Sequence, residues 1–319
     1  MAQPTNTFDT YDAVGIREDL QDVIYSISPT DTPFMSSAAR EAVKNTLHEW
    51  QTDSLAAAST SNAVIEGDDA TLDASSATTR LGNYTQIMDK TVVITGTQES
   101  VDKAGRASEL AYQIAKKSKE LKRDIEATLL ANQAKVAGNA STARKFGSIN
   151  SWIKTNDVFS TGGTTDGASP TGDGSDARTD ADPQEALTEA NLKTVIKGCW
   201  NEGGNPSVIM VGPFNKQKIS GFTGGSTRFD ASEDKTLYTS IDVYSSDFGD
   251  LEVVPNRFSR DRDCFVLDMD YWSIGFLRDI TMHELSKTGD SEKRQLLTEL
   301  TLISRNEAAS GGVFDCTTA

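Results

Sequence analysis

The longest helical pattern in the chain runs from residue 106 to residue 137. Its apolar positions recur at spacings of three to four residues or their sums, which places them in a stripe of roughly 100° on the helix surface. These positions are Leu110, Ile114, Leu121, Ile125, Leu129 and Val136. Gly138 follows the pattern, where a helix commonly ends, so we predict one rod about 50 Å long. We also expect Lys122 and Glu126 to pair across one turn of its polar side.

Residues 1–45 predict an arm that cannot form a core of its own. Short amphipathic patterns lie at 14–27 and 36–44, and a segment with two prolines, 28–33, separates them. Proline biases the residue before it towards an extended conformation, which ends the first pattern. The apolar residues of the arm need another surface to lie on, and Phe34 is a predicted inter-subunit contact for this reason.

Residues 46–97 predict a long hairpin. Alternating and β-branched residues indicate its two strands, at 46–52 and 84–95. The middle consists mostly of Ala, Ser, Thr, Asp and Gly, and it has too few large apolar residues to fold compactly alone. Trp50 and Arg80, on the same extension, are further predicted inter-subunit contacts.

A helix–strand–helix pattern in the middle of the chain predicts a small α/β body. The helices are expected at 183–200 and 213–222, and the strand at 207–212 is an unbroken apolar run, typical of burial on both faces. Another strand is expected within 229–244. Residues 160–182, rich in Gly, Thr, Ser and Asp, are interpreted as a solvated loop.

The aspartates of this loop leave calcium binding open as an alternative. They are Asp173, Asp176, Asp180 and Asp182. Their spacing does not match an EF-hand loop, in which every other position ligates and a glycine turns the chain. We therefore predict no metal-ligating residues.

The C-terminal part is rich in strand patterns. They lie at 264–268, 271–277, 280–285 and 295–304, and short polar turns separate them. These strands are the expected cover for the apolar stripe of the long helix. The tail from Ser310 onwards is expected to fray.

Composition excludes several function classes. The net charge of −16 argues against a dedicated nucleic-acid binder, which needs a basic face. A lysine-rich side of the long helix alternates with acidic residues, so contact with DNA is at most loose; its basic residues are Lys116, Lys117, Lys119, Lys122 and Arg123. No apolar run approaches 18 residues, so we expect no membrane span.

Catalytic chemistry has no motif in its favour. The three cysteines form no CxxC pair, and the two histidines, His48 and His283, lie in strand patterns. No nucleophile elbow, HExxH, dinucleotide-binding or P-loop pattern occurs. We predict no catalytic or cofactor-binding residues, no cofactor, and a protein that is not an enzyme.

The order of arm, long hairpin, spine helix, α/β body and closing strands resembles the major capsid proteins of tailed phages with the HK97 fold. The nearest likeness is to the SU10-like major head protein family. It covers most of the chain, although 160–182 looks like a private insertion. The resemblance is carried by residues 14–20, 27–34, 98–105, 109–113, 119–126, 287–295 and 305–309.

The resemblance implies an α+β fold whose parts have family names. These are an N-terminal arm at 1–45, an extended-loop hairpin at 46–97, a peripheral domain at 98–145 plus 256–319, and an axial domain at 146–255 that includes the insertion at 160–182.

It also implies self-assembly into hexameric and pentameric capsomers of an icosahedral shell around the double-stranded DNA of a tailed bacteriophage. The implied location is the virion, after assembly in the host cytoplasm. The implied partners are neighbouring capsid subunits, the portal, and a scaffold or decoration protein.

Two departures from relatives follow from the residues. Some relatives cross-link a lysine of the extended loop to a neighbour, whereas residues 51–89 contain no lysine. No long helical segment precedes the arm, so we expect no fused scaffold. Two alternatives stay open: the shell of an encapsulin-like cellular compartment, and a small-oligomer binding or decoration module.

Overall fold

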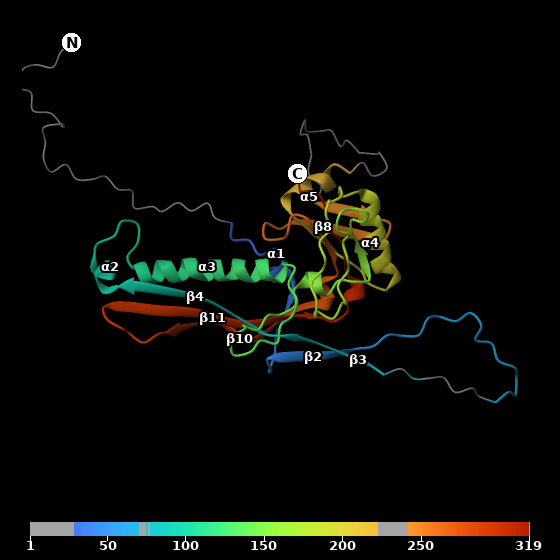
Figure 1. Cartoon of the computed structure of the whole chain (residues 1–319), viewed down its shortest axis with the longest axis horizontal. Helices are drawn as coiled ribbons and strands as arrows, with labels where there is room; N and C mark the ends of the chain where they lie inside the picture. The colour runs from blue at the N-terminus through green and yellow to red at the C-terminus, as the bar shows by residue number, and fades with distance from the viewer. Residues whose placement is uncertain (1–28, 70–74, 76, 223–241, 319) are drawn as a thin grey trace, which may run out of the picture.

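The computed structural model describes residues 29–69, 75, 77–222 and 242–318 of the 319-residue chain. The helix expected at 14–27 and most of the strand expected within 229–244 lie outside these residues. Figure 1 shows an elongated molecule, with a long helix on long strands at one end and an α/β body at the other.

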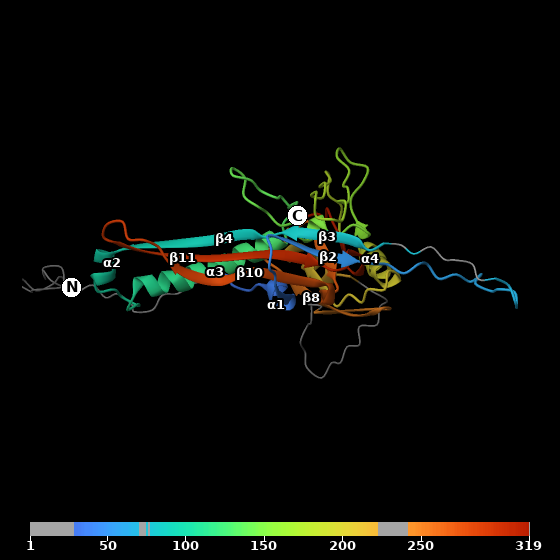
Figure 2. The ribbon, with the colours of Figure 1, turned by 90° about the horizontal axis from the view of Figure 1, so that it is seen from below.

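The long helix, α3, lies along a mixed sheet of four strands (Figure 2). The sheet order is β1-β10-β11-β4, and only β1 and β10 are parallel. The bounds are Glu109–Leu129 for α3, Ala39–Ala42 for β1, Trp272–Glu284 for β10, Ser291–Ser304 for β11 and Gln86–Thr95 for β4. In α3, Leu121, Ile125 and Leu129 are fully buried. The prediction that C-terminal strands cover this helix is confirmed.

Helix α3 is shorter than predicted. It begins after Ser108, whose hydroxyl accepts a hydrogen bond from the Ala111 N–H. It ends at Leu129, because the side chains of Ser148 and Asn150 donate hydrogen bonds to carbonyls that follow the last helical turn. Gly138, with φ of +73°, is therefore not the end of the helix, and it turns a separate loop instead.

The hairpin strands pair differently from the prediction. Strand β2 (Leu47–Thr52) pairs antiparallel with β3 (Thr79–Tyr84). The predicted returning strand, 84–95, is β4, and it pairs with β11 instead. Between β3 and β4, the Thr85 hydroxyl bonds Glu299 of β11. The hairpin therefore ends near residue 84, and β4 belongs to the sheet beneath α3. A short helix, α2 (Gly96–Ser100), follows β4.

The described part of the arm packs on its own chain. Helix α1 (Pro33–Ser37) is followed by β1, where the sequence pattern predicted a helix. Strand β1 is extended because it adds a parallel edge to β10. Phe34 is fully buried in the core that α3 shares with the sheet. The prediction of Phe34 as an inter-subunit contact is therefore wrong, since the side chain has no surface left for a neighbour.

The second body is built on a six-stranded sheet with the order β5-β12-β9-β6-β8-β7. Its strands are β5 (Asn156–Val158), β6 (Val208–Val211), β7 (Val243–Ser246), β8 (Gly249–Pro255), β9 (Cys264–Leu267) and β12 (Gly311–Val313), with helices α4 (Glu189–Asn201) and α5 (Pro213–Ser220). Every residue of β6 is buried, as its apolar run predicted. Because β9 and β12 follow residue 255, this body is not confined to 146–255 as predicted.

Two local predictions in this body are wrong. Helix α4 begins at Glu189 rather than near Pro183, because the Thr188 hydroxyl accepts a hydrogen bond from the Asn191 N–H and sets the first turn. The tail does not fray, because Gly311 starts β12 in the interior of the sheet. A Cβ on Gly311 would lie 2.3 Å from the Asn156 carbonyl oxygen, so this strand position requires glycine.

Candidate inter-subunit surfaces

The middle of the hairpin buries nothing within its own chain. All described residues from Asp53 to Asp69 are exposed, including Leu55 at 98%, Val64 at 82% and Ile65 at 76%. In Figure 1 this segment, called here the extended loop (53–69), projects beyond the α/β body. Exposed apolar side chains on an extension are typical of a surface that another molecule covers.

The base of the hairpin is held firmly on the body. Asn83 is fully buried, and its amide group donates to the carbonyls of Gly147 and Leu302 at 3.1 and 2.8 Å. Its amide oxygen accepts from the Gly147 N–H at 2.8 Å. Such saturated buried bonding rigidifies a junction. Asn83 therefore fixes the base of the hairpin, from which the extended loop projects.

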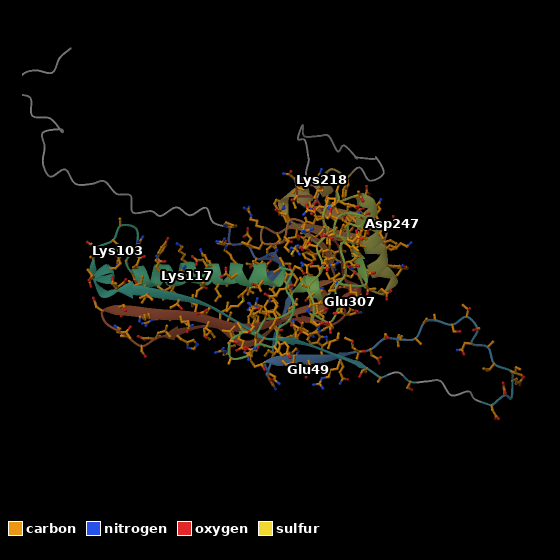
Figure 3. All side chains as sticks on the ribbon, in the orientation of Figure 1. Glu49, Lys103, Lys117, Lys218, Asp247 and Glu307 are labelled. Carbon is orange, nitrogen blue, oxygen red and sulfur yellow. The ribbon has the colours of Figure 1, made fainter. Side chains whose placement is uncertain are left out.

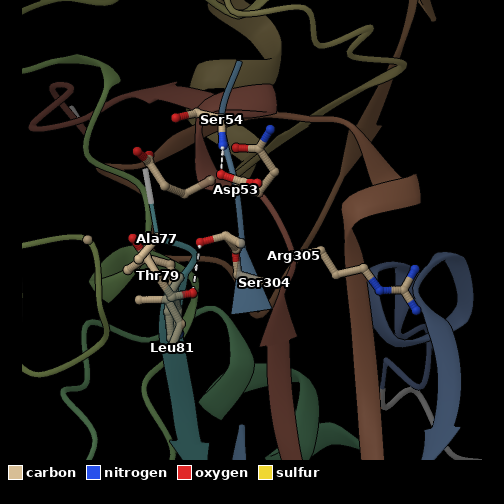
Figure 4. A pocket seen from close by; sticks show the side chains of 12 residues that line it. Asp53, Ser54, Ala77, Thr79, Leu81, Ser304 and Arg305 are labelled. Atoms are coloured by element: carbon tan, nitrogen blue, oxygen red, sulfur yellow. Dashed lines mark hydrogen bonds between the residues drawn. The ribbon is translucent and has the colours of Figure 1, made fainter. Parts of the chain in front are cut away.

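A cleft lies where the hairpin meets the body (Figure 4). Its lining includes Asp53, Thr79, Leu81 and Arg305. Thr79 and Leu81 come from β3, whereas Arg305 follows β11. The cleft is thus a junction between the hairpin and the sheet, and it gathers no catalytic set of side chains.

The two other predicted contacts lie on the hairpin. Trp50 is half-buried, and its ring packs 5.4 Å from the ring of Trp152 in the same chain. Arg80 is exposed and forms an ion pair with Glu49, which Figure 3 labels at the base of the hairpin. Trp50 therefore fixes the hairpin on its own body, and only its exposed part is open to a neighbour. Contact of Trp50 and Arg80 with another subunit stays a prediction.

The insertion at 160–182 is clamped to the α/β body by arginines. Arg178, only 3% exposed, donates to the Asp157 carboxylate at 2.6 Å and to the Ile153 carbonyl at 2.7 Å. Its guanidinium lies 3.6 Å from the centre of the Phe314 ring. Arg260 pairs with Asp180 at 2.5 Å. The interpretation of the whole segment as a solvated loop is therefore wrong for its second half.

Three of the four aspartates considered for calcium have other side-chain partners. Asp173 and Asp176 accept hydrogen bonds within their own loop, from Thr171 among others. Asp180 faces Arg260 and Arg262. In the parts of the chain that the structure describes, no three His, Cys, Asp or Glu side chains gather closely enough to hold a metal ion.

Asp263 lies beside Arg260 and is almost fully buried. One carboxylate oxygen accepts from the Asn150 side chain at 2.8 Å, while the other has no hydrogen-bond partner. Burial raises the pKa of Asp263 from 3.8 to about 6, although Arg260 acts in the opposite direction. The charged form is disfavoured because the protein solvates the carboxylate less well than water does.

A pH dependence of stability follows from Asp263. A carboxyl whose pKa is raised by folding contributes stability below its unfolded pKa, and this contribution is lost as the pH rises through the folded value. Between about pH 4 and 6, Asp263→Asn should therefore gain stability relative to the unsubstituted chain, by on the order of 2 kcal/mol. Urea unfolding at several pH values measures the difference. An offset that stays constant with pH would contradict it; exposed Asp247→Asn is the control.

The polar side of α3 is only partly paired. Lys117 bonds Glu120 at 2.6 Å, and Lys90 of β4 bonds Asp124 at 2.6 Å (Figure 3 labels Lys117). The predicted pair of Lys122 with Glu126 is wrong. The Glu126 carboxylate is fully buried beneath α1, where it accepts hydrogen bonds from the backbone N–H groups of Phe34 and Met35.

Sequence reasoning missed three polar anchors. Glu126 joins the arm to α3, Asn83 joins the hairpin to the body, and Glu299 accepts from Thr85, Arg144 and Arg278. The sequence pattern places Glu126 on the polar side of the long helix, and Glu299 lies within the strand predicted at 295–304. No local pattern distinguishes these residues from exposed polar ones, because their partners are distant in sequence.

Within the described residues, no helix has the length and hydrophobicity needed to cross a membrane.

Comparisons with known proteins agree on one family. The family model described as SU10 major capsid protein matches residues 3–317. The major capsid protein of Escherichia phage Phieco32 is 29% identical over 347 residues, covering 98% of this chain and 98% of that protein.

Solved structures show the fold. A chain of the cyanophage A-1(L) capsid has a TM-score of 0.65 at 12% identity, covering 98% of this chain and 99% of that one. A capsid chain of a native GTA particle has a TM-score of 0.61 at 10% identity, covering 97% and 98%. The predicted α+β, HK97-like capsid fold is confirmed. Because the family model spans nearly the whole sequence, the chain belongs to the SU10 major capsid protein family and is a major capsid protein of a phage.

Proposed function

We propose that this chain builds the icosahedral shell around the double-stranded DNA of a tailed phage, as hexameric and pentameric capsomers. The observation that carries the proposal is the extended loop, which is exposed along its described length although Asn83 anchors the base of the hairpin to the body. An extension of this kind gains its cover from neighbouring subunits.

The proposal places assembly in the host cytoplasm and the finished protein in the virion. Its partners are neighbouring capsid subunits and the portal, with a scaffold or decoration protein as a further partner. The role is structural rather than enzymatic. The cluster of Arg178, Arg260 and Arg262 supports this, because the guanidinium groups pair with aspartates and with backbone carbonyls.

Electron microscopy of the purified, assembled protein tests the proposal. We expect closed shells of megadalton mass. A protein that stays a monomer or small oligomer under all assembly conditions, with a protease-resistant extended loop, would instead support a binding or decoration module. Particles from infected cells distinguish a phage head from a cellular compartment, because only the former contain the phage genome.

The assembled shell should lack covalent cross-links made by the hairpin. Residues 51–89 contain no lysine, so no ε-amino group is present there to form an isopeptide bond with a neighbour. Boiled particles should run as a single monomer band on a denaturing gel. A ladder of multimers, with linked peptides from this segment in mass spectra, would show the prediction to be wrong.

A further inference from the structure

Strand β7 forms an open edge of the six-stranded sheet in the α/β body. It is the last strand in the sheet order, and no strand of the described residues pairs with its outer side. Figure 3 labels Asp247, in the turn after β7, on the side of the body that faces away from Lys117 of α3. The strand contains no proline or lysine, the residues that commonly prevent strand addition at an edge. Its outer side therefore offers backbone hydrogen bonds to another extended chain.

The backbone groups that face outwards from this edge belong to Val243 and Ser245. Strand β7 pairs antiparallel with β8, and the Val253 N–H of β8 donates to the carbonyl of Asp242, the residue before β7, at 2.8 Å. Residues along an antiparallel pair alternate between bonding the partner strand and facing away from it. Tyr244 therefore bonds β8, whereas the N–H and C=O groups of Val243 and Ser245 are left for a strand on the other side.

The face of the sheet beside α4 is apolar and aromatic at this edge. A cleft between α4 and β7 is lined by Ile196, Tyr244 and Phe248, together with exposed Lys197. Trp200, 54% exposed, packs against Phe248 with the ring centres 5.2 Å apart. Apolar side chains of an added strand fit this face, because they cover exposed aromatic surface, while Lys197 repels a cation.

The opposite face is acidic at the same edge. Exposed Asp250 and Glu252 of β8 lie directly across from Ser245 and Val243, on the face away from α4. Residues 236–256 contain no lysine or arginine that would neutralise them. A strand added to β7 lies two strand spacings, about 10 Å, from β8. A lysine or arginine of that strand can extend over the small Ser245 side chain to these carboxylates.

We propose that the outer edge of β7 binds an extended strand of a separate protein, in which apolar residues alternate with lysine or arginine. The apolar residues enter the cleft beside α4, and the basic residues pair with Asp250 and Glu252. A second copy of this chain fits less well, because it brings a net charge of −16 to an acidic edge. The inference rests on the proposed function, in which a scaffold or decoration protein is a further partner, and it names the surface and the chemistry that recognise such a protein.

A heptapeptide in which lysine and valine alternate tests the inference on the full-length chain. Hydrogen exchange with mass spectrometry should show slower exchange at 243–246 when this peptide is present, and tryptophan fluorescence measures its affinity. Ser245→Pro should lower the affinity by about tenfold or more, because it removes an outward N–H that the fold does not use. Ser245→Ala keeps that N–H and should bind like the unsubstituted chain. Asp250→Lys/Glu252→Lys should also lose about tenfold, and should instead bind a peptide in which glutamate and valine alternate.

Asp102→Lys/Asp279→Lys is the matched control, because it changes the net charge equally at exposed acids outside the α/β body. It should bind the lysine peptide normally. Circular dichroism checks that each variant is folded, and if Ser245→Pro is not, the charge-reversed variant decides. No binding by the unsubstituted chain, or equal affinity for the lysine and glutamate peptides, overturns the inference. Normal peptide binding but lost shells in Ser245→Pro assigns the edge to a second copy and also overturns it. The peptide result holds whether or not shells form, so a chain that forms no shells refutes the proposed function alone.

Discussion

Replacing Arg178 by alanine should lower the free energy of unfolding by about 3–5 kcal/mol. The guanidinium is buried between the Asp157 carboxylate and the Phe314 ring. Burial lowers the pKa of Arg178, while Asp157 counteracts this effect. Alanine leaves a carboxylate that is 6% exposed without its cation. An unpaired buried charge costs more than the pair itself contributes, which is why one-sided removal has a large effect.

Urea unfolding of the unassembled subunit measures the loss. Arg257→Ala is the matched control, because Arg257 is exposed in the same body and its removal should change stability by less than about 0.5 kcal/mol. The double variant Arg178→Met/Asp157→Leu should recover much of the loss, since it removes both charges and keeps apolar volume. Equal losses in Arg178→Ala and Arg257→Ala would contradict the burial argument.

Replacing Glu126 by leucine should destabilise the subunit by about 3 kcal/mol and release the arm. The Glu126 carboxylate accepts from the N–H groups of Phe34 and Met35 at 2.7 and 2.8 Å, and from the Asn256 side chain at 2.6 Å. Leucine leaves the two backbone N–H groups buried without an acceptor, and the Asn256 amide keeps only its bond to the Met210 sulfur. The loss of stability is smaller than the sum of three hydrogen-bond contributions. Burial raises the pKa of Glu126, because it disfavours the charged carboxylate, and leucine carries no charge to desolvate.

Limited proteolysis with mass spectrometry should show new cleavage around residues 29–37 in Glu126→Leu, together with a lower unfolding midpoint in urea. The stability of Glu126→Gln should lie between those of the unsubstituted chain and Glu126→Leu, because the glutamine oxygen still accepts from one of the donors. Glu120→Gln is the control on the same helix, since its pair with Lys117 is half-exposed and contributes under about 1 kcal/mol. An arm that stays protected in Glu126→Leu would show that Phe34 alone holds it.

Several elements could be predicted from the sequence because their cause is local. The unbroken apolar run of β6 reports burial on both faces, and the helical spacing of Leu121, Ile125 and Leu129 reports one buried side of α3. The exposed loop could also be predicted, because a segment almost without large apolar residues has nothing to bury. The family resemblance added the order of the parts.

The candidate surfaces were predicted less completely. The sequence indicated that the hairpin would reach beyond its own body, and the structure shows the loop exposed there. It also placed Phe34 at a subunit interface, whereas the structure buries Phe34 against α3. Whether a side chain on an extension meets its own core depends on the path of the chain, which composition does not report.

The sequence by itself determined the long helix, the buried strand β6, the exposed loop and its acidic charge. Only the tertiary structure decided that β4 pairs with β11, that α3 stops at Leu129, and that Gly311 lies inside a sheet. Each depends on a partner far along the chain: a strand edge, a capping side chain, or a carbonyl that leaves no room for a Cβ. Periodicity records which side of an element is apolar, whereas these contacts are set by what is packed against it.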